Sequence, residues 1–344
     1  MEQTFTIPPA LSNQTLAAAL RTLLPNLSWS HAKRLITSRR IQVNGVLTLN
    51  DARRLSVGEA ITILPESAQP VPTEHSVRLL HMDADLLVLD KPAGVITLRR
   101  DEEFRFSQDR KDLQPSLDEL VQRMLPTAAA SNARAAHARP RRASSRARRK
   151  DIPLYAVHRL DRDTSGLMLF ALTPRARNAL IDLFSRHAVE RSYVAVARGA
   201  IPAAMTLDTH FVRDRGDGLR GSVALPRDDS KRAVTQFTPL EHFADAAGNA
   251  YTLLHCRLET GRTHQIRIHL AEIGHPLCGE KLYRLPRPGA PEEPDPSAAP
   301  RQALHSATLR LTHPFTRQPL EFTSPLPPDL SSWLEKLRPP RAAS

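Results

Sequence analysis

The segment PLYAVHRLDRDTSGLMLFAL, residues 153–172, joins the densest polar cluster of the chain to an uninterrupted apolar run. Its polar part, HRLDRDTSG (158–166), holds two Asp, two Arg, one His and two hydroxyl side chains. Its apolar part, GLMLFAL (166–172), is short and continuous, which predicts a buried strand. A simple turn does not require so many charges, so this segment is the first candidate for a functional site.

Three interpretations of the polar cluster are open from its residues alone. In the first, Asp161 and Asp163 form a pair of carboxylates for acid/base chemistry. In the second, one Asp is a nucleophile held by an Arg, and the other accepts backbone hydrogen bonds in a turn. In the third, the cluster is a surface turn whose charges neutralise one another. Composition favours the surface turn about as much as the two catalytic interpretations.

A second polar cluster, ETGRTHQIRIH (259–269), stands at a predicted junction between a strand and a helix. A helix N-terminus with Arg262 and His264 beside it suits a phosphate group. The alternative is a capped helix whose basic residues are solvated. Arg267 has an isoleucine on each side, and a charge in such surroundings is costly unless it is paired. We therefore expect Arg267 to need a carboxylate, and Asp161 is the candidate.

The predicted elements of residues 76–338 mix strands and helices without regular βαβ alternation. This favours the α+β class, with a mixed, largely antiparallel central sheet and flanking helices. The predicted strands lie at 86–90, 166–172, 192–199, 252–260 and 303–314, and the predicted helices at 113–125, 174–187, 263–274 and 330–337.

The first 65 residues predict a separate small α/β module. Leucines at helical spacing in residues 14–24 indicate one helix, and a second helix is expected from Ser28 or Ser30 to about Thr37. The run IQVNGVLTL (41–49) alternates around Asn-Gly, a strong hairpin signal, and a short strand follows at 60–64. We expect this module at 1–65, a linker at 66–75 and the larger domain at 76–338.

Net charge points to an acidic polymer as the partner of this chain. The formal charge is +12, with a pI near 10.4, which favours nucleic acid ahead of an anionic membrane. Residues 131–150 carry eight Lys or Arg and no acidic residue; without them, 40 basic residues stand against 36 acidic ones. A basic insert at about 126–150 is expected to be disordered, either as a solvated segment or as an arm that contacts RNA.

Two cysteines, Cys256 and Cys278, are too few and too far apart for a disulfide framework or a structural zinc site. The N-terminal MEQTFTIPPA lacks the basic and apolar regions of a signal peptide. No apolar run approaches the length of a membrane span. These features predict a soluble, cytoplasmic protein with no membrane partner.

Residues 153–172 resemble the catalytic motif of the RluA family of pseudouridine synthases, whose pattern is His-Arg-Leu-Asp, two variable residues and Thr-Ser-Gly-Leu. Four further segments match that family in order, and residues 14–65 resemble the S4 RNA-binding domain. Nearly the whole chain outside the basic insert and the termini is covered. The four segments are LLVLDKPAGV (86–95), RSYVAVARG (191–199), ETGRTHQIRIHLAEIGHPLCGEKLY (259–283) and ALHSATLRLTHPFTRQPLEFTSPLP (303–327).

The resemblance implies an isomerase that converts uridines of RNA to pseudouridine, most often in large-subunit ribosomal RNA. It makes Asp161 the essential aspartate, Tyr193 the residue that lies against the uracil, and Arg267 the partner of the aspartate. Arg159 would fill the gap left by the flipped base. It further implies no metal and no cofactor, and a monomer is expected. Residues expected to contact RNA in the larger domain are Arg159, Arg262, His264 and Gln265.

In the S4-like module, the resemblance places Lys33, Arg34, Arg39 and Arg40 against RNA phosphates, which position the substrate without reading its bases. Asp163 is assigned to the structure of the motif. Two departures from the family pattern, Arg191 in place of Lys and Glu280 in place of Asp, are not expected to touch a catalytic assignment.

Three other functions remain as alternatives. The first is a pseudouridine synthase that acts on transfer RNA. The second is a non-catalytic RNA-binding protein of the S4 type. The third is a glycosidase or nucleoside hydrolase that uses Asp161 and Asp163, although an RNA-binding module argues against a small free substrate.

Overall fold

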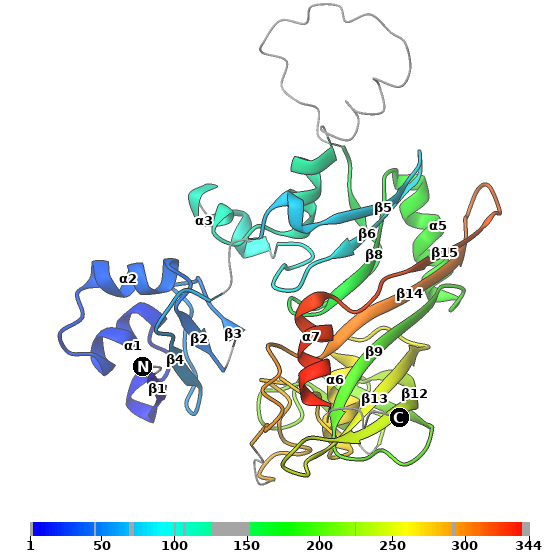
Figure 1. Cartoon of the computed structure of the whole chain (residues 1–344). Coiled ribbons are helices and arrows are strands. Elements are labelled where there is room, and N and C mark those ends of the chain that lie inside the picture. The colour runs from blue at the N-terminus through cyan, green and yellow to red at the C-terminus, as the bar shows by residue number, and fades with distance from the viewer. Residues whose placement is uncertain are drawn as a thin grey trace, which may run out of the picture. The chain divides into compact units, whose positions relative to one another are not determined.

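The computed structural model describes residues 3–44, 46–68, 72–99, 101–105, 108–125, 152–223, 225–290 and 294–338. They form two compact units, Met1–Pro72 with Arg100–Pro115 and Thr73–Arg99 with Ser116–Ser344 (Figure 1). Residues 100–115, expected in the larger domain, thus group with the N-terminal unit. The predicted basic insert at 126–150 lies outside the described residues. Within the described part of the chain, no helix is long and apolar enough to cross a membrane.

The N-terminal unit contains a four-stranded antiparallel sheet in the order β1-β4-β2-β3. The two predicted helices and the hairpin are present, and their apolar faces form one core with the sheet. Strand β1 had not been predicted. The elements are β1 (Gln3–Thr6), α1 (Leu16–Leu23), α2 (Trp29–Thr37), β2 (Ile41–Val43), β3 (Val46–Leu47), β4 (Ala60–Ile63) and α3 (Gln108–Asp112).

The larger unit is built on one mixed sheet in which the described strands pair antiparallel, except for β14 with β8. The order is β11-β10-β12-β13-β9-β14-β8-β6-β5, with β15 on β14 and β7 on β8. The strands are β5 (Arg78–Met82), β6 (Leu86–Lys91), β7 (Tyr155–Ala156), β8 (Ser165–Ala171), β9 (Glu190–Arg198), β10 (Met205–Val212), β11 (Gly221–Val223), β12 (Lys231–Ala244), β13 (Ala250–Leu258), β14 (Leu304–Thr312) and β15 (Pro319–Thr323).

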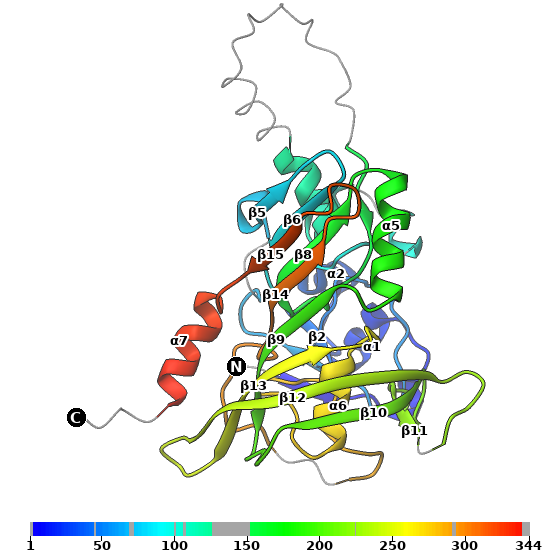
Figure 2. The same cartoon turned by 90° about the vertical axis from the view of Figure 1, so that its right-hand side faces the viewer.

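Helices pack on both faces of this sheet, which explains why β8 is buried throughout. Leu167 and Leu169 join a core that includes α5 (Pro174–Ser185), while Met168 and Phe170 face the core of the helix at 117–125. Figure 2 shows α5 along β8 and α6 (Gln265–Glu272) near β12; α7 (Pro328–Leu337) is the last helix. The prediction of a mixed, largely antiparallel α+β fold is confirmed.

Strands β10, β11 and β12 lie in a stretch for which the sequence predicted no element. The exposed face of β10 carries Thr, Asp and His, so its apolar signal is weak. Strand β12 contains Pro239, and its pairing with β13 shifts register there. Both features hide the alternation that marks a half-buried strand.

One row of paired residues crosses the middle of the sheet and sets the position of the loops around it. Cys256 of β13 pairs with Tyr193 of β9, Tyr193 with Ser306 of β14, and Ser306 with Gly166 of β8. The end of β13 and the beginning of β8 therefore lie at the same level. This register brings the loop before β8 close to the loop that leads from β13 into α6.

Gly166 is the tightest point of this row. Its φ is +112°, and a Cβ atom there would lie 2.2 Å from the backbone oxygen of Ser306. We expect Gly166→Ala to lower the free energy of unfolding by about 3 kcal/mol or more, because backbone strain adds to a clash with a main-chain atom. Urea unfolding measures the loss.

Gly274→Ala is the matched control for Gly166→Ala. Gly274 also has a positive φ, +82°, but no atom would lie within 4 Å of an added Cβ. Gly274→Ala should lower the free energy of unfolding by about 1–2 kcal/mol, the cost of a positive φ in a residue other than glycine. Equal losses for the two variants would show that β8 and β14 do not need their close approach.

Candidate active site

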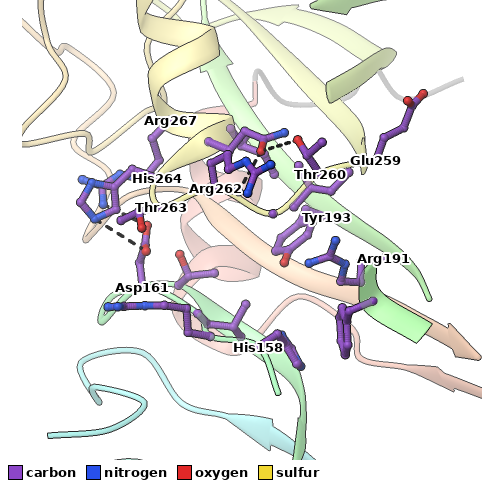
Figure 3. A pocket seen from close by; sticks show the side chains of 18 of the residues that line it. His158, Asp161, Arg191, Tyr193, Glu259, Thr260, Arg262, Thr263, His264 and Arg267 are labelled. Atoms are coloured by element: carbon purple, nitrogen blue, oxygen red, sulfur yellow. Dashed lines mark hydrogen bonds and ion pairs between the residues drawn. The ribbon is translucent and has the colours of Figure 1, made fainter. Parts of the chain in front are cut away.

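A cavity of about 610 Å³ opens where the loop before β8 meets the loop between β13 and α6. Figure 3 shows the side chains that converge on it. Two side chains of β9, Arg191 and Tyr193, point into it because residues two apart in a strand share a face. The loops contribute residues 157–161 and 259–264, and α5 contributes Phe184.

Arg267 lies between two carboxylates at one end of this cavity. Its Nη1 donates to Asp161 Oδ2 at 3.1 Å. Its Nε and Nη2 donate to Glu280 Oε2 and Oε1, each at 2.7 Å. The expected contact between Asp161 and Arg267 is therefore present. The bidentate pair with Glu280 fixes the guanidinium and leaves one N–H edge for Asp161.

Glu280, whose departure from the family's Asp was expected to leave the catalytic assignments unchanged, is in direct contact with Arg267. Its side chain is 1% exposed and accepts hydrogen bonds from the backbone N–H groups of Leu282 and Tyr283. Contact with Arg267 and these hydrogen bonds outweigh burial, so the pKa of Glu280 lies below its usual value. Both carboxylates around Arg267 are ionised at neutral pH.

Asp161 is ionised for similar reasons. Burial raises the pKa of this carboxyl, but His264, Arg267 and Arg159 together lower it further, so that it ends below its usual value of 3.8. The contribution of His264 requires a protonated imidazole, and burial lowers the pKa of His264 to about 4. At neutral pH the imidazole is neutral, and Arg267 is the main group that keeps Asp161 charged.

The backbone conformation of His264 and a contact with the hydroxyl of Tyr283 orient its imidazole. His264 has φ +61° and ψ +21° at the residue before α6, in the left-handed region, which turns the chain sharply into the helix. Its Nδ1 lies 2.7 Å from the hydroxyl of Tyr283, and its Nε2 lies 3.7 Å from Asp161 Oδ1. Tyr283 had not been predicted as part of the site. The only sequence signal for it was its place at the end of the matched segment 259–283.

Tyr193 forms part of the cavity wall from the middle of β9. It is 5% exposed, and burial raises the pKa of its phenol, with Asp161 adding to the effect and Arg191 and Ser306 opposing it. The phenol is therefore protonated at neutral pH. The side chain lines the cavity, and its hydroxyl interacts with Ser306.

Gln265 does not fit its predicted contact with RNA. Its Oε1 accepts from Thr260 Oγ1 at 2.8 Å and from the N–H of Arg262 at 2.9 Å. Its Nε2 donates to the carbonyl of Val234 and to Thr235 Oγ1. The side chain is buried and its hydrogen-bonding groups are used inside the protein, so the predicted RNA contact is wrong. Gln265 fastens the loop before α6 to β12.

The other basic residues differ in their access to solvent. Arg159 and Arg262 are exposed and line the cavity. On α2, Lys33 and Arg34 are exposed. Arg40 is half-buried, and its Nε donates to the carbonyl of Leu64 at 2.8 Å.

Arg39 is a correction to the predicted phosphate contacts. It is 5% exposed, and its guanidinium donates to the carbonyls of Ala68 and Leu113. Its φ of +62° turns the chain out of α2. The side chain thus holds the N-terminal unit together and is not presented to a ligand.

Asp83, Asp85 and His313 are the one group among the described residues that brings three potential metal ligands within 4.8 Å of one another. His313 Nδ1 accepts hydrogen bonds from the backbone N–H groups of Phe315 and Thr316. Its proton is then on Nε2, which lies 3.3 Å from Asp83 Oδ2. A ring nitrogen that keeps its proton offers no lone pair to a metal. This group is better described as a cluster of polar contacts, in which His313 Nε2 has no hydrogen-bond partner among the described residues.

Comparison with known proteins identifies the family. Residues 85–272 match the family described as RNA pseudouridylate synthase. The chain is 32% identical to ribosomal large subunit pseudouridine synthase D of Xanthomonas campestris pv. campestris over 96% of this chain and 91% of that protein. It is also 32% identical to the protein of the same name from Escherichia coli (strain K12), over 98% and 95% of the two chains.

Solved structures agree on the fold. Human RNA pseudouridylate synthase domain containing 4 superimposes with a TM-score of 0.54 at 22% identity, covering 76% of this chain and 92% of that one. Human RNA pseudouridylate synthase domain containing 1 gives 0.53 at 21% identity, covering 77% and 90%. The fold is that of a pseudouridine synthase. The chain belongs to the RNA pseudouridylate synthase family, in its RluA-type branch, and the predicted enzyme class is confirmed.

Proposed function

We propose that this enzyme isomerises a specific uridine of large-subunit ribosomal RNA, with Asp161 as its catalytic carboxylate. The observation that carries the proposal is the ionised Asp161, held at the cavity by an arginine that Glu280 fixes in place. The relatives at 32% identity are named ribosomal large subunit pseudouridine synthase D. That name favours ribosomal RNA over transfer RNA as the substrate.

The reaction needs what this cavity provides. Uridine and pseudouridine are isomers: the N-glycosidic bond breaks, the uracil turns, and a C–C bond forms at C5. The C5 proton leaves to water and N1 takes up a proton, so the composition of the nucleotide is unchanged. The target base must first leave its stack, at a cost of a few kcal/mol. Arg159 is exposed and lines the cavity, which supports the proposal that its side chain occupies the gap. The anionic carboxylate of Asp161 then attacks the nucleotide or assists cleavage of the glycosidic bond.

Tyr193 serves the same reaction in two ways. Its ring offers a face for the uracil, and stacking of a base on an aromatic ring is worth about 1–3 kcal/mol. Its hydroxyl assists the departure of the C5 proton. Because burial raises its pKa, the phenol is protonated in the resting enzyme. It can therefore act only as a relay, which releases its own proton to water in the cavity as it accepts the proton from C5.

We test the reaction with large-subunit ribosomal RNA transcribed in vitro and labelled with tritium at uridine C5. Isomerisation should release tritium to water while the RNA chain stays intact. A nucleoside hydrolase would instead release free uracil, and a protein that only binds RNA would release neither. Labelled transfer RNA is the comparison substrate; faster release from it would overturn the ribosomal assignment.

The N-terminal unit is proposed to act as an S4-type RNA-binding domain. Lys33 and Arg34 are exposed on α2, where long basic side chains reach RNA phosphates. Replacing both with Gln should reduce the salt dependence of RNA binding, by a slope of about 0.7–0.9 for each phosphate that is no longer neutralised. Stability should change by less than about 0.5 kcal/mol.

The control for this double variant is Lys336→Gln, which removes an exposed charge from α7. Filter binding at several salt concentrations measures the RNA affinity of the wild type, the double variant and Lys336→Gln. If Lys33→Gln/Arg34→Gln keeps the wild-type slope, α2 does not bind RNA phosphates.

A further inference from the structure

Arg191 is a buried cation without a carboxylate partner among the described residues. It is 8% exposed, and its Nε has no hydrogen-bond partner in the described part of the chain. Its guanidinium lies over the ring of Phe184, with Cζ 5.1 Å from the ring centroid. That contact fixes the plane of the guanidinium and supplies no negative charge.

Other buried arginines of this unit are neutralised. Arg99 pairs with Glu119 at 2.6 Å, and Arg301 pairs with Asp329 at 2.7 Å. A buried charge without such a partner is costly to the folded state. A protein that keeps one beside a functional cavity gains from it only when a ligand supplies the missing charge.

The charge of Arg191 faces the cavity. Arg191 lines the cavity, and in Figure 3 its guanidinium lies beyond Tyr193 as seen from Asp161. Gly261, on the opposite loop, has no side chain, and a Cβ there would lie 2.8 Å from Arg191 Nη1. The glycine at this position therefore makes room for the guanidinium itself beside the loop.

We propose that Arg191 binds a backbone phosphate of the RNA next to the target uridine. The proposal deepens, and rests on, the assignment of RNA as the substrate of this cavity. A phosphodiester is the anion that RNA carries, and the planar guanidinium matches its oxygens. The neutral oxygens of uracil accept hydrogen bonds but do not balance the charge. The phosphate and Asp161 would hold the target nucleotide from opposite sides of Tyr193.

Arg191→Gln is the test variant, Arg191→Lys retains the charge, and Arg177→Gln is the matched control on the exposed face of α5. The measurements are the salt dependence of RNA binding between about 50 and 200 mM salt, KM and kcat from tritium release, and the melting temperature without RNA. The RNA is the same in vitro transcript of large-subunit ribosomal RNA.

For Arg191→Gln we expect RNA binding about tenfold or more weaker, as for loss of a charged hydrogen bond, with a proportionate rise in KM. The slope of the logarithm of the binding constant against the logarithm of the salt concentration should fall in magnitude by about 0.7–0.9, the contribution of one phosphate. The melting temperature should stay the same or rise, because an unpaired buried charge is gone. Arg191→Lys should recover most of the slope, and Arg177→Gln should match the wild type.

Two results would overturn the phosphate site. One is an unchanged salt slope in Arg191→Gln, whatever happens to stability. The other is a fall in kcat with a shifted pH profile at unchanged KM, which would mean that Arg191 acts through Tyr193. A failure of the ribosomal assignment gives a different result. The wild type would then release no tritium from the ribosomal transcript, while the salt dependence of RNA binding would still show whether Arg191 contacts a phosphate.

Discussion

Asp161→Asn should reduce tritium release by roughly 10⁴-fold or more, the scale on which enzymes lose activity when a group that performs the chemistry is removed. Asparagine keeps the size of the side chain and can still accept a hydrogen bond from Arg267 Nη1. It cannot act as an anion or a nucleophile. RNA affinity should stay within a few-fold of the wild type, because the carboxylate does chemistry and does not dock the substrate.

The matched control is Asp163→Asn, two residues along the same loop. The backbone oxygen of Asp163, and not its carboxylate, accepts a hydrogen bond from Arg301. We therefore expect nearly normal turnover for this variant. If both variants lose activity equally, the two carboxylates act as a pair, which would favour the hydrolase mechanism. Turnover near wild type in Asp161→Asn would remove that residue from the mechanism altogether.

Arg267→Met should impair both stability and activity. It leaves Glu280 buried without its partner, and removing one member of a buried ion pair costs about 3–5 kcal/mol. It also removes the cation that opposes burial at Asp161, so the pKa of Asp161 should rise. The acid side of the profile of kcat/KM against pH should move upward with it.

The sign of the stability effect follows from the lowered pKa values. Asp161 and Glu280 both have folded-state pKa values below their usual ones. Their contribution to stability is therefore complete above the usual carboxylate range and is lost as the pH falls through the lowered values. In Arg267→Met this contribution disappears, so urea unfolding should show a smaller loss of stability as the pH falls below the usual carboxylate range.

The double variant Arg267→Met/Glu280→Gln separates the two roles of Arg267. The new glutamine side chain would need no cation, and its Oε1 can still accept from the backbone N–H of Leu282. We expect much of the stability to return while the pH profile stays shifted. If wild-type activity also returned, Arg267 would only support the fold, and Asp161 would not depend on it for its charge.

The sequence was most informative where a charged residue stands among apolar neighbours. Arg267 stands in an apolar run, so the sequence predicted its need for a carboxylate, and the structure supplies Asp161. The role of Glu280 was not predicted, because Asp161 alone already met the expected need of Arg267. A guanidinium has donors on more than one edge, and this was the overlooked signal.

Elsewhere the residue types were known from the sequence but their geometry was not. Gln265 and Arg39 are polar and stand beside basic neighbours, which suggested RNA contacts. Each instead turns its donors toward carbonyls of its own unit. Such contacts depend on the left-handed turns after α2 and before α6 and on loops packed from distant positions, which local pattern does not reveal. The same applies to Tyr283, which meets His264 only after the chain has folded back.

The arrangement of Asp161, Arg267 and Glu280 has a consequence for how a nucleotide can enter. Asp161 and Glu280 share the guanidinium of Arg267 at one end of the cavity. The carboxylate of Asp161 presents negative charge to the cavity, while Arg159 carries positive charge on its exposed side. A phosphate that approached Asp161 directly would be repelled, while an uncharged base would not. We expect a nucleotide to enter with its base toward Asp161 and with its sugar-phosphate chain toward the arginines around the opening. An enzyme that must detach and rotate a base gains from rejecting the reversed orientation before any bond is broken.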